Sequence, residues 1–187
     1  MMMLAIDIET LGLFENGTAP EITCVCMYDG QHEYTFQIWQ APDKESKMHQ
    51  IIHLLDSASH IAGYNAIYFD LEVIRVNFGI SAEKMTKWVL KCIDPFMHMK
   101  LILQSPCKLQ TLLNLNQLES KTGNGLDAIS LAKGGQWEAL LDYCLTDAKL
   151  THQLCSLQPI RLNSFLILSN FSPPSPLDDE AKFRFAE

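Results

Sequence analysis

Three segments with the composition of β-strands begin this sequence, and segments with helical spacing fill most of the remainder. Residues 3–8 form a short apolar run that ends in acids, which is typical of a buried strand. Residues 21–28 and 32–39 are rich in β-branched and aromatic side chains, and Asp29-Gly30 between them predicts a hairpin. Strands that precede helices, with strand–helix alternation in the middle, predict an α/β layered domain with a mixed sheet.

The other elements follow from apolar spacing and from turn residues. Short apolar runs predict two more strands, at residues 60–64 and 88–93. Helical periodicity predicts helices at residues 46–55, 66–78, 109–118, 126–132 and 136–157. Gly79 ends the second of these helices, and Pro159 follows the last.

The end of the chain differs in composition from the rest. Residues 172–187 are first rich in Pro and Ser and then charged, which is typical of a flexible tail. We therefore expect one domain at residues 1–160, followed by a C-terminal extension at residues 161–187. Phe183 and Phe185 leave open a second interpretation, in which this tail docks on a protein partner.

Composition and charge exclude several functional classes. Hydrophobic residues make up 48% of the chain, so wholesale disorder is excluded. The formal net charge of −8 excludes a histone-like protein held to nucleic acid by bulk charge alone. Residues 73–136 nevertheless carry eight bases and four acids and could line the path of a polyanion, although solvated helix faces are the simpler explanation.

The sequence shows no sign of export or of a membrane span. No apolar run approaches the roughly 20 residues that a transmembrane helix needs. The apolar N-terminus has no basic residues and is interrupted by Asp7 and Glu9, unlike a secretory signal. The six cysteines form no Cys-x-x-Cys pair and have mostly apolar neighbours, so we expect reduced, buried thiols. We therefore expect a soluble, cytoplasmic protein.

Acidic residues at three places form the strongest functional signal. In Ala5-Ile6-Asp7-Ile8-Glu9, side chains alternate along the predicted strand, so Asp7 and Glu9 project from one face. Two acids at the end of an apolar strand are unfavourable unless a cation lies between them. Ordinary surface acids at a half-exposed strand end remain the alternative, because Asp-x-Glu alone is a weak signal.

Two further fragments are equally weak on their own. Asp70 lies near the start of the predicted helix 66–78, where an acid also stabilises the helix dipole. Tyr143 and Asp147 lie four residues apart on the predicted helix 136–157 and therefore share a face. A tyrosine packed on the core beside an exposed aspartate explains that second fragment without any function.

Taken together and in this order, the three fragments are far more specific. Asp-x-Glu on a first strand, Tyr-Asn-x-x-x-Phe-Asp at a strand–helix junction and Tyr-x-x-x-Asp on a late helix resemble the motifs of the DEDD superfamily of 3′→5′ exonucleases. The tyrosine before the last aspartate resembles the DEDDy subgroup. GYNAIYFDLEVI and WEALLDYCLTDAKLTHQL are similar to the proofreading exonuclease domain of B-family DNA polymerases and to its free-standing relatives. The resemblance covers about residues 3–157 and implies a ribonuclease H-like fold.

The resemblance also implies a catalytic site and its cofactors. Four carboxylates would hold two divalent ions: Asp7, Glu9, Asp70 and Asp147. Converging carboxylates need cations near neutral pH, and hard oxygen ligands select Mg²⁺ or Mn²⁺. Two such ions ~3.5–4 Å apart stabilise both the attacking and the leaving oxygen of an in-line phosphoryl displacement. Because a phenol with an ordinary pKa of about 10 is a poor base at neutral pH, we expect Tyr143 to orient the attacking water.

The implied substrate is nucleic acid with a free 3′ end. Single nucleotides would leave as nucleoside 5′-monophosphates, with single-stranded DNA favoured and RNA possible, and the enzyme would be free-standing or a recruited subunit. Family members often touch the terminal nucleotide just after the second acid, which makes Thr10 and Leu11 candidate contacts. Asn65 and Phe69 belong to the second motif and are further candidates, although core packing or loop structure explains all four positions as well.

Other interpretations remain open. The same fold could serve a catalytically silent nucleic-acid-binding or adaptor module, a ribonuclease that trims RNA 3′ ends, or an endonuclease. Three more groups are weaker candidates: the His49–His53 pair and the Cys24-x-Cys26 pair as metal ligands, and Asp94 as an addition to the acidic site. For these we expect an amphipathic helix face, core packing and no part in the acidic site, respectively.

Overall fold

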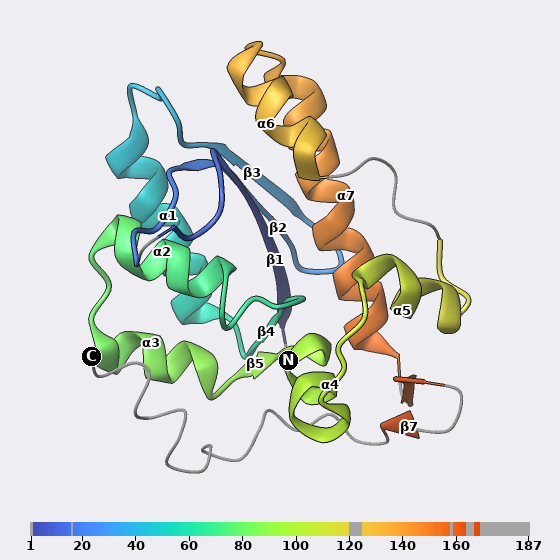
Figure 1. Ribbon diagram of the computed structural model, residues 1–187. Helices are drawn as coiled ribbons and strands as arrows, with labels where there is room; N and C mark the ends of the chain where they lie inside the picture. Colours follow the sequence, from blue (N-terminus) through green and yellow to red (C-terminus); the bar gives the residue numbers. More distant parts are fainter. Residues whose placement is uncertain (1, 16, 120–124, 158, 164–166, 169–187) are drawn as a thin grey trace.

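The computed structural model describes most of the chain, namely residues 2–15, 17–119, 125–157, 159–163 and 167–168 (Figure 1). Its centre is a mixed five-stranded sheet with the strand order β3-β2-β1-β4-β5. The helices flank both faces of this sheet. The α/β class with a mixed sheet is therefore confirmed.

The first strand is the centre of the sheet. β1 (Met3–Thr10) pairs antiparallel with β2 (Ile22–Tyr28) and parallel with β4 (His60–Ala62). β3 (Glu33–Gln37) and β5 (Cys92–Ile93) form the two edges. The predicted hairpin is confirmed as β2 and β3. β1 is two residues longer than predicted, because Glu9 and Thr10 also pair with β2.

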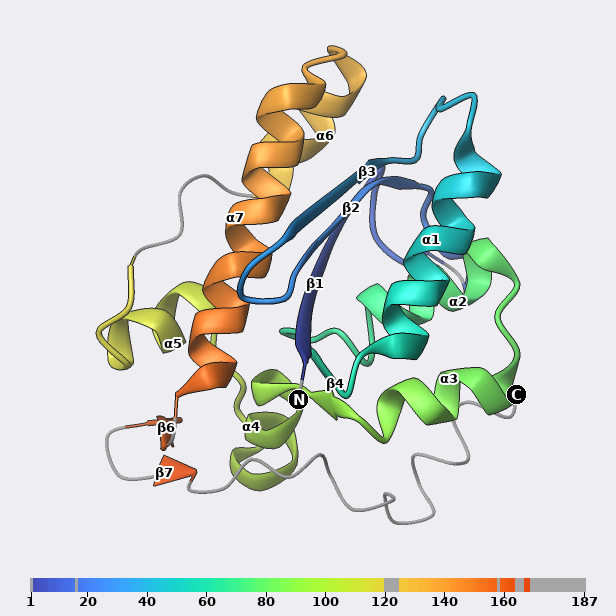
Figure 2. The same cartoon turned by 180° about the vertical axis from the view of Figure 1, so that it is seen from behind.

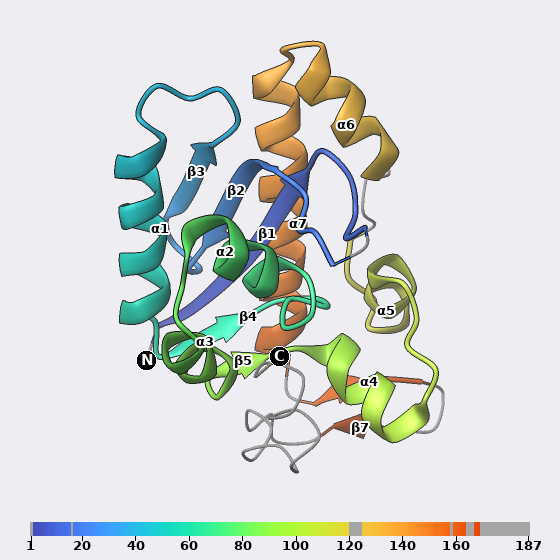
Figure 3. The ribbon, with the colours of Figure 1, turned by 60° about the vertical axis from the view of Figure 1, so that its left-hand side comes forward.

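Alternation along β1 divides its side chains between two layers. Leu4, Ile6 and Ile8 join the largest apolar cluster together with side chains of α1 (Lys44–Ser57) and α2 (Asp70–Phe78). The other face of β1 and β2 is covered by the long helix α7 (Trp137–Ser156). Figure 3 shows α2 in front of the sheet and α7 behind it. Residues of odd number on β1, Asp7 and Glu9 among them, therefore face α7.

The remaining elements surround this frame. Two views show α6 beside the N-terminal half of α7 (Figures 1 and 2). The short strands β6 and β7 pair antiparallel in a separate sheet. The bounds of these elements are α3 (Ala82–Val89), α4 (Pro95–Leu103), α5 (Leu109–Leu115), α6 (Gly125–Lys133), β6 (Ile160–Arg161) and β7 (Ile167–Leu168).

The predicted strand at residues 88–93 is wrong over most of its length. Only Cys92 and Ile93 form β5, and Trp88 lies in α3. Ser81 caps this helix by accepting a hydrogen bond from the Lys84 backbone N–H. The side chain of Trp88 is buried and donates its indole N–H to Asp56 at 2.8 Å. The large apolar residue that suggested a strand therefore packs into the core from a helix.

The helix predicted at residues 66–78 begins later, at Asp70. Residues 66–69 form a turn before the helix starts, and Asn65, which precedes this turn, has a left-handed φ of +65°. The helix α4 was not predicted, although Asp94-Pro95 is a helix-start signal, with Asp94 as the N-cap and Pro95 in the first turn.

Two expectations about the chain as a whole remain predictions. Residues 169–187, and with them the expected tail and its partner, lie outside the described residues. The division at residue 160 falls within β6 and stays a prediction.

In the described part of the chain, no helix combines the length and the apolar character needed to cross a membrane.

Candidate active site

The register of β1 places two acids under α7. Asp7 and Glu9 lie opposite Cys26 and Cys24 of β2, and directly opposite residues of an antiparallel pair share a face. The isoleucines that alternate with the acids are fixed in the core on the other face. A slip of one residue would bury both acids among apolar side chains, so the hydrophobic pattern strongly specifies their position.

The helix α7 contributes a third acid. Asp147 lies in the middle of this helix, and its side chain is 2% exposed. One carboxylate oxygen from each of Asp7, Glu9 and Asp147 lies within 4.8 Å of the other two. The structure therefore brings together three of the four predicted metal ligands, and we call these residues the acidic cluster. A donor set made only of carboxylate oxygens fits Mg²⁺ or Mn²⁺.

The fourth predicted ligand reaches β1 from its open edge. In the described part of the chain, β4 ends at Ala62, opposite Ala5, and no strand pairs with that side of β1 farther along. There Asp70 accepts a hydrogen bond from the backbone N–H of Ile8 at 3.0 Å. Burial, with repulsion from two nearby carboxylates, raises the pKa of Asp70 to about 7. Asp70 thus contacts the strand that carries Asp7 without joining the acidic cluster.

A buried carboxylate holds the turn that precedes Asp70. Asp94 is fully buried and accepts hydrogen bonds from the backbone N–H groups of Asn65 at 2.9 Å and Ile67 at 3.1 Å. It also accepts one from Met97 at the start of α4. Burial raises the pKa of Asp94 to about 6 in spite of these bonds. Asp94 therefore organises the approach to Asp70, a role that the sequence analysis did not assign to it.

The raised pKa values of Asp70 and Asp94 predict how stability depends on pH. An acid whose pKa rises on folding binds its proton more tightly in the folded chain, so it stabilises the fold as the pH falls. The free energy of unfolding should therefore gain a contribution from both residues as the pH drops from about 7 to about 4, the ordinary carboxyl range. Urea unfolding in EDTA measures this gain, which should be smaller in Asp70→Asn. Equal gains in both proteins would contradict the prediction.

Tyr143 lies one turn before Asp147 on the helix that covers β1. Its hydroxyl oxygen is buried, and its ring packs on the apolar cluster between α7 and β2. Leu11, just beyond the end of β1, packs on the same cluster. Thr10 is buried and donates its hydroxyl to the Gly12 carbonyl at 2.6 Å, so this side chain stabilises the turn after the strand.

The two candidates from the second motif have structural roles. Asn65 occupies the turn at positive φ, and its backbone is bound by Asp94. Phe69 packs on the main core and meets Phe14 edge to face, with ring centroids 6.1 Å apart. His49 and His53 lie exposed on α1, as expected for the polar face of a helix.

Three thiols form a second group beside the acids, which the sequence analysis did not anticipate. The sulfur atoms of Cys24, Cys26 and Cys144 lie within 4.8 Å of one another, and we call these residues the thiol cluster. The neighbouring Cys144 and Cys26 thiols hold the pKa of the Cys24 thiol well below its ordinary value. Burial raises the pKa of Cys144. The Cys-x-Cys spacing on β2 was visible in the sequence, but its third member comes from a distant helix.

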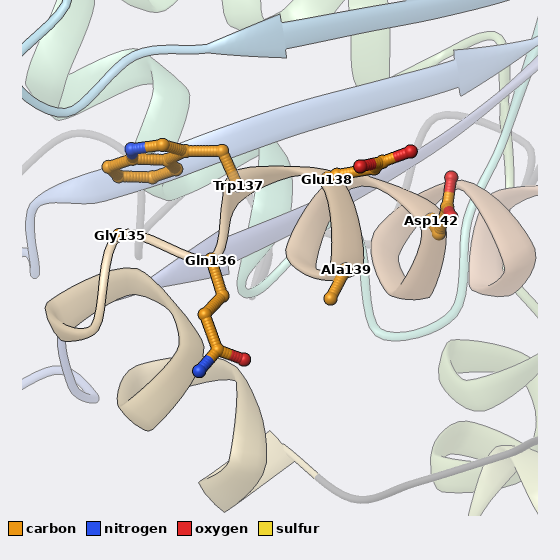
Figure 4. Close-up of a pocket in the computed structure, with 6 residues that line it drawn as sticks. All are labelled: Gly135, Gln136, Trp137, Glu138, Ala139 and Asp142. Carbon is orange, nitrogen blue, oxygen red and sulfur yellow. The ribbon is translucent and has the colours of Figure 1, made fainter.

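A hollow of about 540 Å³ lies at the N-terminal end of α7 (Figure 4). It is lined by Gly135, Gln136, Trp137, Glu138, Ala139 and Asp142 and by none of the acidic cluster. Figure 4 shows Gln136 and Trp137 pointing apart, with Glu138 and Asp142 on the same side of the helix. Two carboxylates in its lining make this hollow unfavourable for a phosphate group.

Several of the basic residues between positions 73 and 136 form local contacts. Lys84 pairs with Asp56 at 2.6 Å, and Lys87 pairs with Glu83 at 2.7 Å. Lys100 lies over the ring of Tyr68, with its amine 4.4 Å from the centroid. These contacts favour the interpretation of this stretch as solvated helix faces.

Comparison with known proteins agrees with this architecture. A model of the RNase H superfamily matches residues 4–157. The structure of the family B DNA polymerase from the hyperthermophilic archaeon Pyrobaculum calidifontis is similar, with a TM-score of 0.59 and 12% sequence identity. This match covers 82% of the present chain and 24% of the polymerase chain, so the likeness concerns the fold of about a quarter of that protein.

A structure of exonuclease I matches with a TM-score of 0.48 and 16% identity, covering 81% of this chain and 41% of that one. No curated protein sequence matches the chain. The match to the superfamily model includes all but the first residue of β1, the turn before Asp70 and all of α7, which are the segments that carry the acids. On this match and on its fold, the chain belongs to the RNase H superfamily.

Proposed function

We propose that this chain is a divalent-metal-dependent nuclease, and more specifically a 3′→5′ exonuclease of the DEDDy subgroup. The observation that carries the proposal is the convergence of Asp7, Glu9 and Asp147 within 4.8 Å on an RNase H superfamily domain. The substrate is the free 3′ end of nucleic acid, with single-stranded DNA favoured and RNA as the alternative. The products are nucleoside 5′-monophosphates.

The side chains at the site fit a pair of Mg²⁺ or Mn²⁺ ions. Asp7, Glu9 and Asp147 would hold them, with Asp70 as the fourth carboxylate next to β1. When bound, such ions stabilise the negative charge on the attacking and leaving oxygens of a phosphodiester. The protein supplies the negative potential that concentrates these ions, because converging carboxylates cannot all ionise near neutral pH without cations.

Tyr143 is proposed as the residue that positions the attacking water. It precedes Asp147 by one turn of α7, so its hydroxyl projects from the face of the helix that carries Asp147. Its ring is held by the apolar cluster between α7 and β2, which limits its rotation. A hydroxyl fixed in this way can accept or donate one hydrogen bond and orient water without taking its proton, which suits a phenol of high ordinary pKa.

Leu11 and the backbone around Thr10 are proposed to contact the terminal nucleotide. Thr10 and Leu11 are the two residues after Glu9, and Leu11 packs on the same cluster as Tyr143. The Thr10 hydroxyl is used by the Gly12 carbonyl, so we assign its contact to the backbone. We assign Asn65 and Phe69 to supporting the Asp70 turn, since Asn65 is bound by Asp94 and Phe69 packs in the core.

Labelled oligonucleotides test the proposed activity. A single-stranded DNA labelled at its 5′ end should shorten stepwise with Mn²⁺, whereas the same strand labelled at its 3′ end should release labelled mononucleotide at once. Matched RNA strands decide the sugar preference. Cleavage of circular single-stranded DNA would replace the proposal with an endonuclease, and binding without turnover would replace it with a silent module.

Replacing Tyr143 with Phe should slow hydrolysis by about 10²-fold or less, because the water loses its orienting partner while the ions keep theirs. The ring and its packing on the apolar cluster are retained, so the fold should be unaffected. Single-turnover kinetics at saturating Mn²⁺ measure the rate, and the Mn²⁺ dependence of that rate measures the metal affinity. A weaker metal affinity at an unchanged saturated rate would show that Tyr143 serves the ions instead.

A further inference from the structure

The thiol cluster lies between β2 and α7, next to the acidic cluster. Cys24 and Cys26 come from β2 and Cys144 from α7, and the three thiols are free and fully buried. Their sulfur atoms lie within 4.8 Å of one another, a separation from which all three can contact one cation. We propose that the thiol cluster binds one thiophilic d¹⁰ cation, of the class of Zn²⁺ or Cu⁺, through three thiolates.

The packing of the chain already sets up this arrangement. Alternation along β2 puts both of its cysteines on the face that α7 covers, opposite Asp7 and Glu9 of β1. Cys144 belongs to the buried face of α7 and is fixed there by the same apolar contacts. Little conformational entropy is therefore lost when the three sulfurs converge on an ion.

Two thiols of the cluster donate hydrogen bonds to backbone carbonyls, and these bonds would be lost when an ion binds. The Cys26 thiol donates to the Leu141 carbonyl at 3.5 Å, and the Cys144 thiol donates to the Asp7 carbonyl at 3.3 Å. Sulfur is a weak donor, so these bonds are a small loss compared with three metal–thiolate bonds. Binding of a divalent cation converts three thiols into three thiolates and releases three protons to the solvent.

The two clusters select different ions. Thiolates favour Zn²⁺ and Cu⁺, whereas carboxylates favour Mg²⁺ and Mn²⁺. The proposed thiolate site is therefore distinct from the ions of the proposed nuclease, and neither proposal depends on the other. Among the described residues, Cys92, Cys107 and Cys155 belong to no such group of three ligands.

Cadmium is the probe for this site, because it binds thiolates and reports them by ultraviolet charge-transfer absorption. Titration of the full chain, kept reduced with a phosphine, should give one thiolate-bound Cd²⁺ per chain and should release protons. The ¹¹³Cd chemical shift of the complex should fall in the range of sulfur-rich sites. A shift in the range of oxygen ligands, or no charge-transfer band, would overturn the proposal without the use of any variant.

Matched variants locate the site. Cys144→Ala should lose the charge-transfer band, whereas Cys155→Ala, which changes another buried cysteine of α7, should keep it. Asp7→Asn should also keep the band, which separates this site from the acidic cluster. Retention of the band in folded Cys144→Ala, checked by circular dichroism, would exclude the thiol cluster as the cadmium ligand.

Discussion

Asp7→Asn should abolish metal-dependent nuclease activity, with a loss of at least ~10³-fold, and should leave the chain folded and equally or more stable. The activity falls because the amide removes a negative charge from the group of three carboxylates whose oxygens lie within 4.8 Å. The stability is kept because the same change relieves repulsion between those carboxylates. Release of mononucleotides from a labelled strand measures the activity, and urea unfolding in EDTA measures the stability.

The control for this substitution is Asp142→Asn. Asp142 lies on the same helix as Asp147, but it is exposed and lies outside the acidic cluster. Replacing it with Asn removes one negative charge, as Asp7→Asn does. Its activity should stay within about twofold of the wild type, since isolated surface charges have small effects. Wild-type turnover in Asp7→Asn would remove Asp7 from the site, and with it the central element of the proposed function.

Gly63→Ala should destabilise the chain by about 3 kcal/mol, the upper range for overpacking a tight contact. A Cβ atom on Gly63 would lie 2.1 Å from the Cβ of Ala66, so the turn between β4 and α2 could form only after its backbone moved. This turn carries the backbone groups that Asp94 binds and leads directly to Asp70. Urea unfolding should give the loss of stability, and the nuclease assay should show a parallel loss of activity.

Two further variants separate the contact between positions 63 and 66 from the general cost of replacing a glycine. Gly63→Ala combined with Ala66→Gly removes the opposing Cβ and should recover most of the lost stability. Gly79→Ala adds a Cβ where no atom lies within 4 Å, so only its φ of +65° opposes the change, at about 1 kcal/mol. If the double variant were as unstable as Gly63→Ala alone, the contact with Ala66 would not be the cause.

The parts of the fold and of the site that depend on local pattern were predictable. The alternation of Asp7 and Glu9 with isoleucines gave their shared face, and helical spacing gave the shared face of Tyr143 and Asp147. Strands joined by Asp29-Gly30 formed the expected hairpin. In each case the residues concerned lie close together in the chain, and their side-chain directions follow from backbone geometry alone.

The parts that depend on distant partners were not predictable from the sequence. The indole of Trp88, on α3, donates its N–H to Asp56 of α1, 32 positions earlier in the chain. Asp94 serves a turn almost 30 positions earlier, a separation at which no sequence period operates. The thiol cluster likewise needs a cysteine from α7 to reach β2. Periodicity predicts the face of the helix or strand on which each of these residues lies. Which residues of another element contact that face depends on tertiary packing.

The shortness of β4 has a consequence for the whole site. β4 leaves β1 at the pair Ala5–Ala62, and three more residues of pairing would have joined Ile8 to Asn65. The amide of Ile8 would then be spent within the sheet, and Asp70 would have no group to hold it beside the central strand. Because β4 ends early, no strand pairs with the backbone N–H of Ile8 on this side, and the carboxylate of Asp70 accepts it instead. Lengthening β4 would therefore remove the hydrogen bond that holds Asp70, the proposed fourth carboxylate, beside β1.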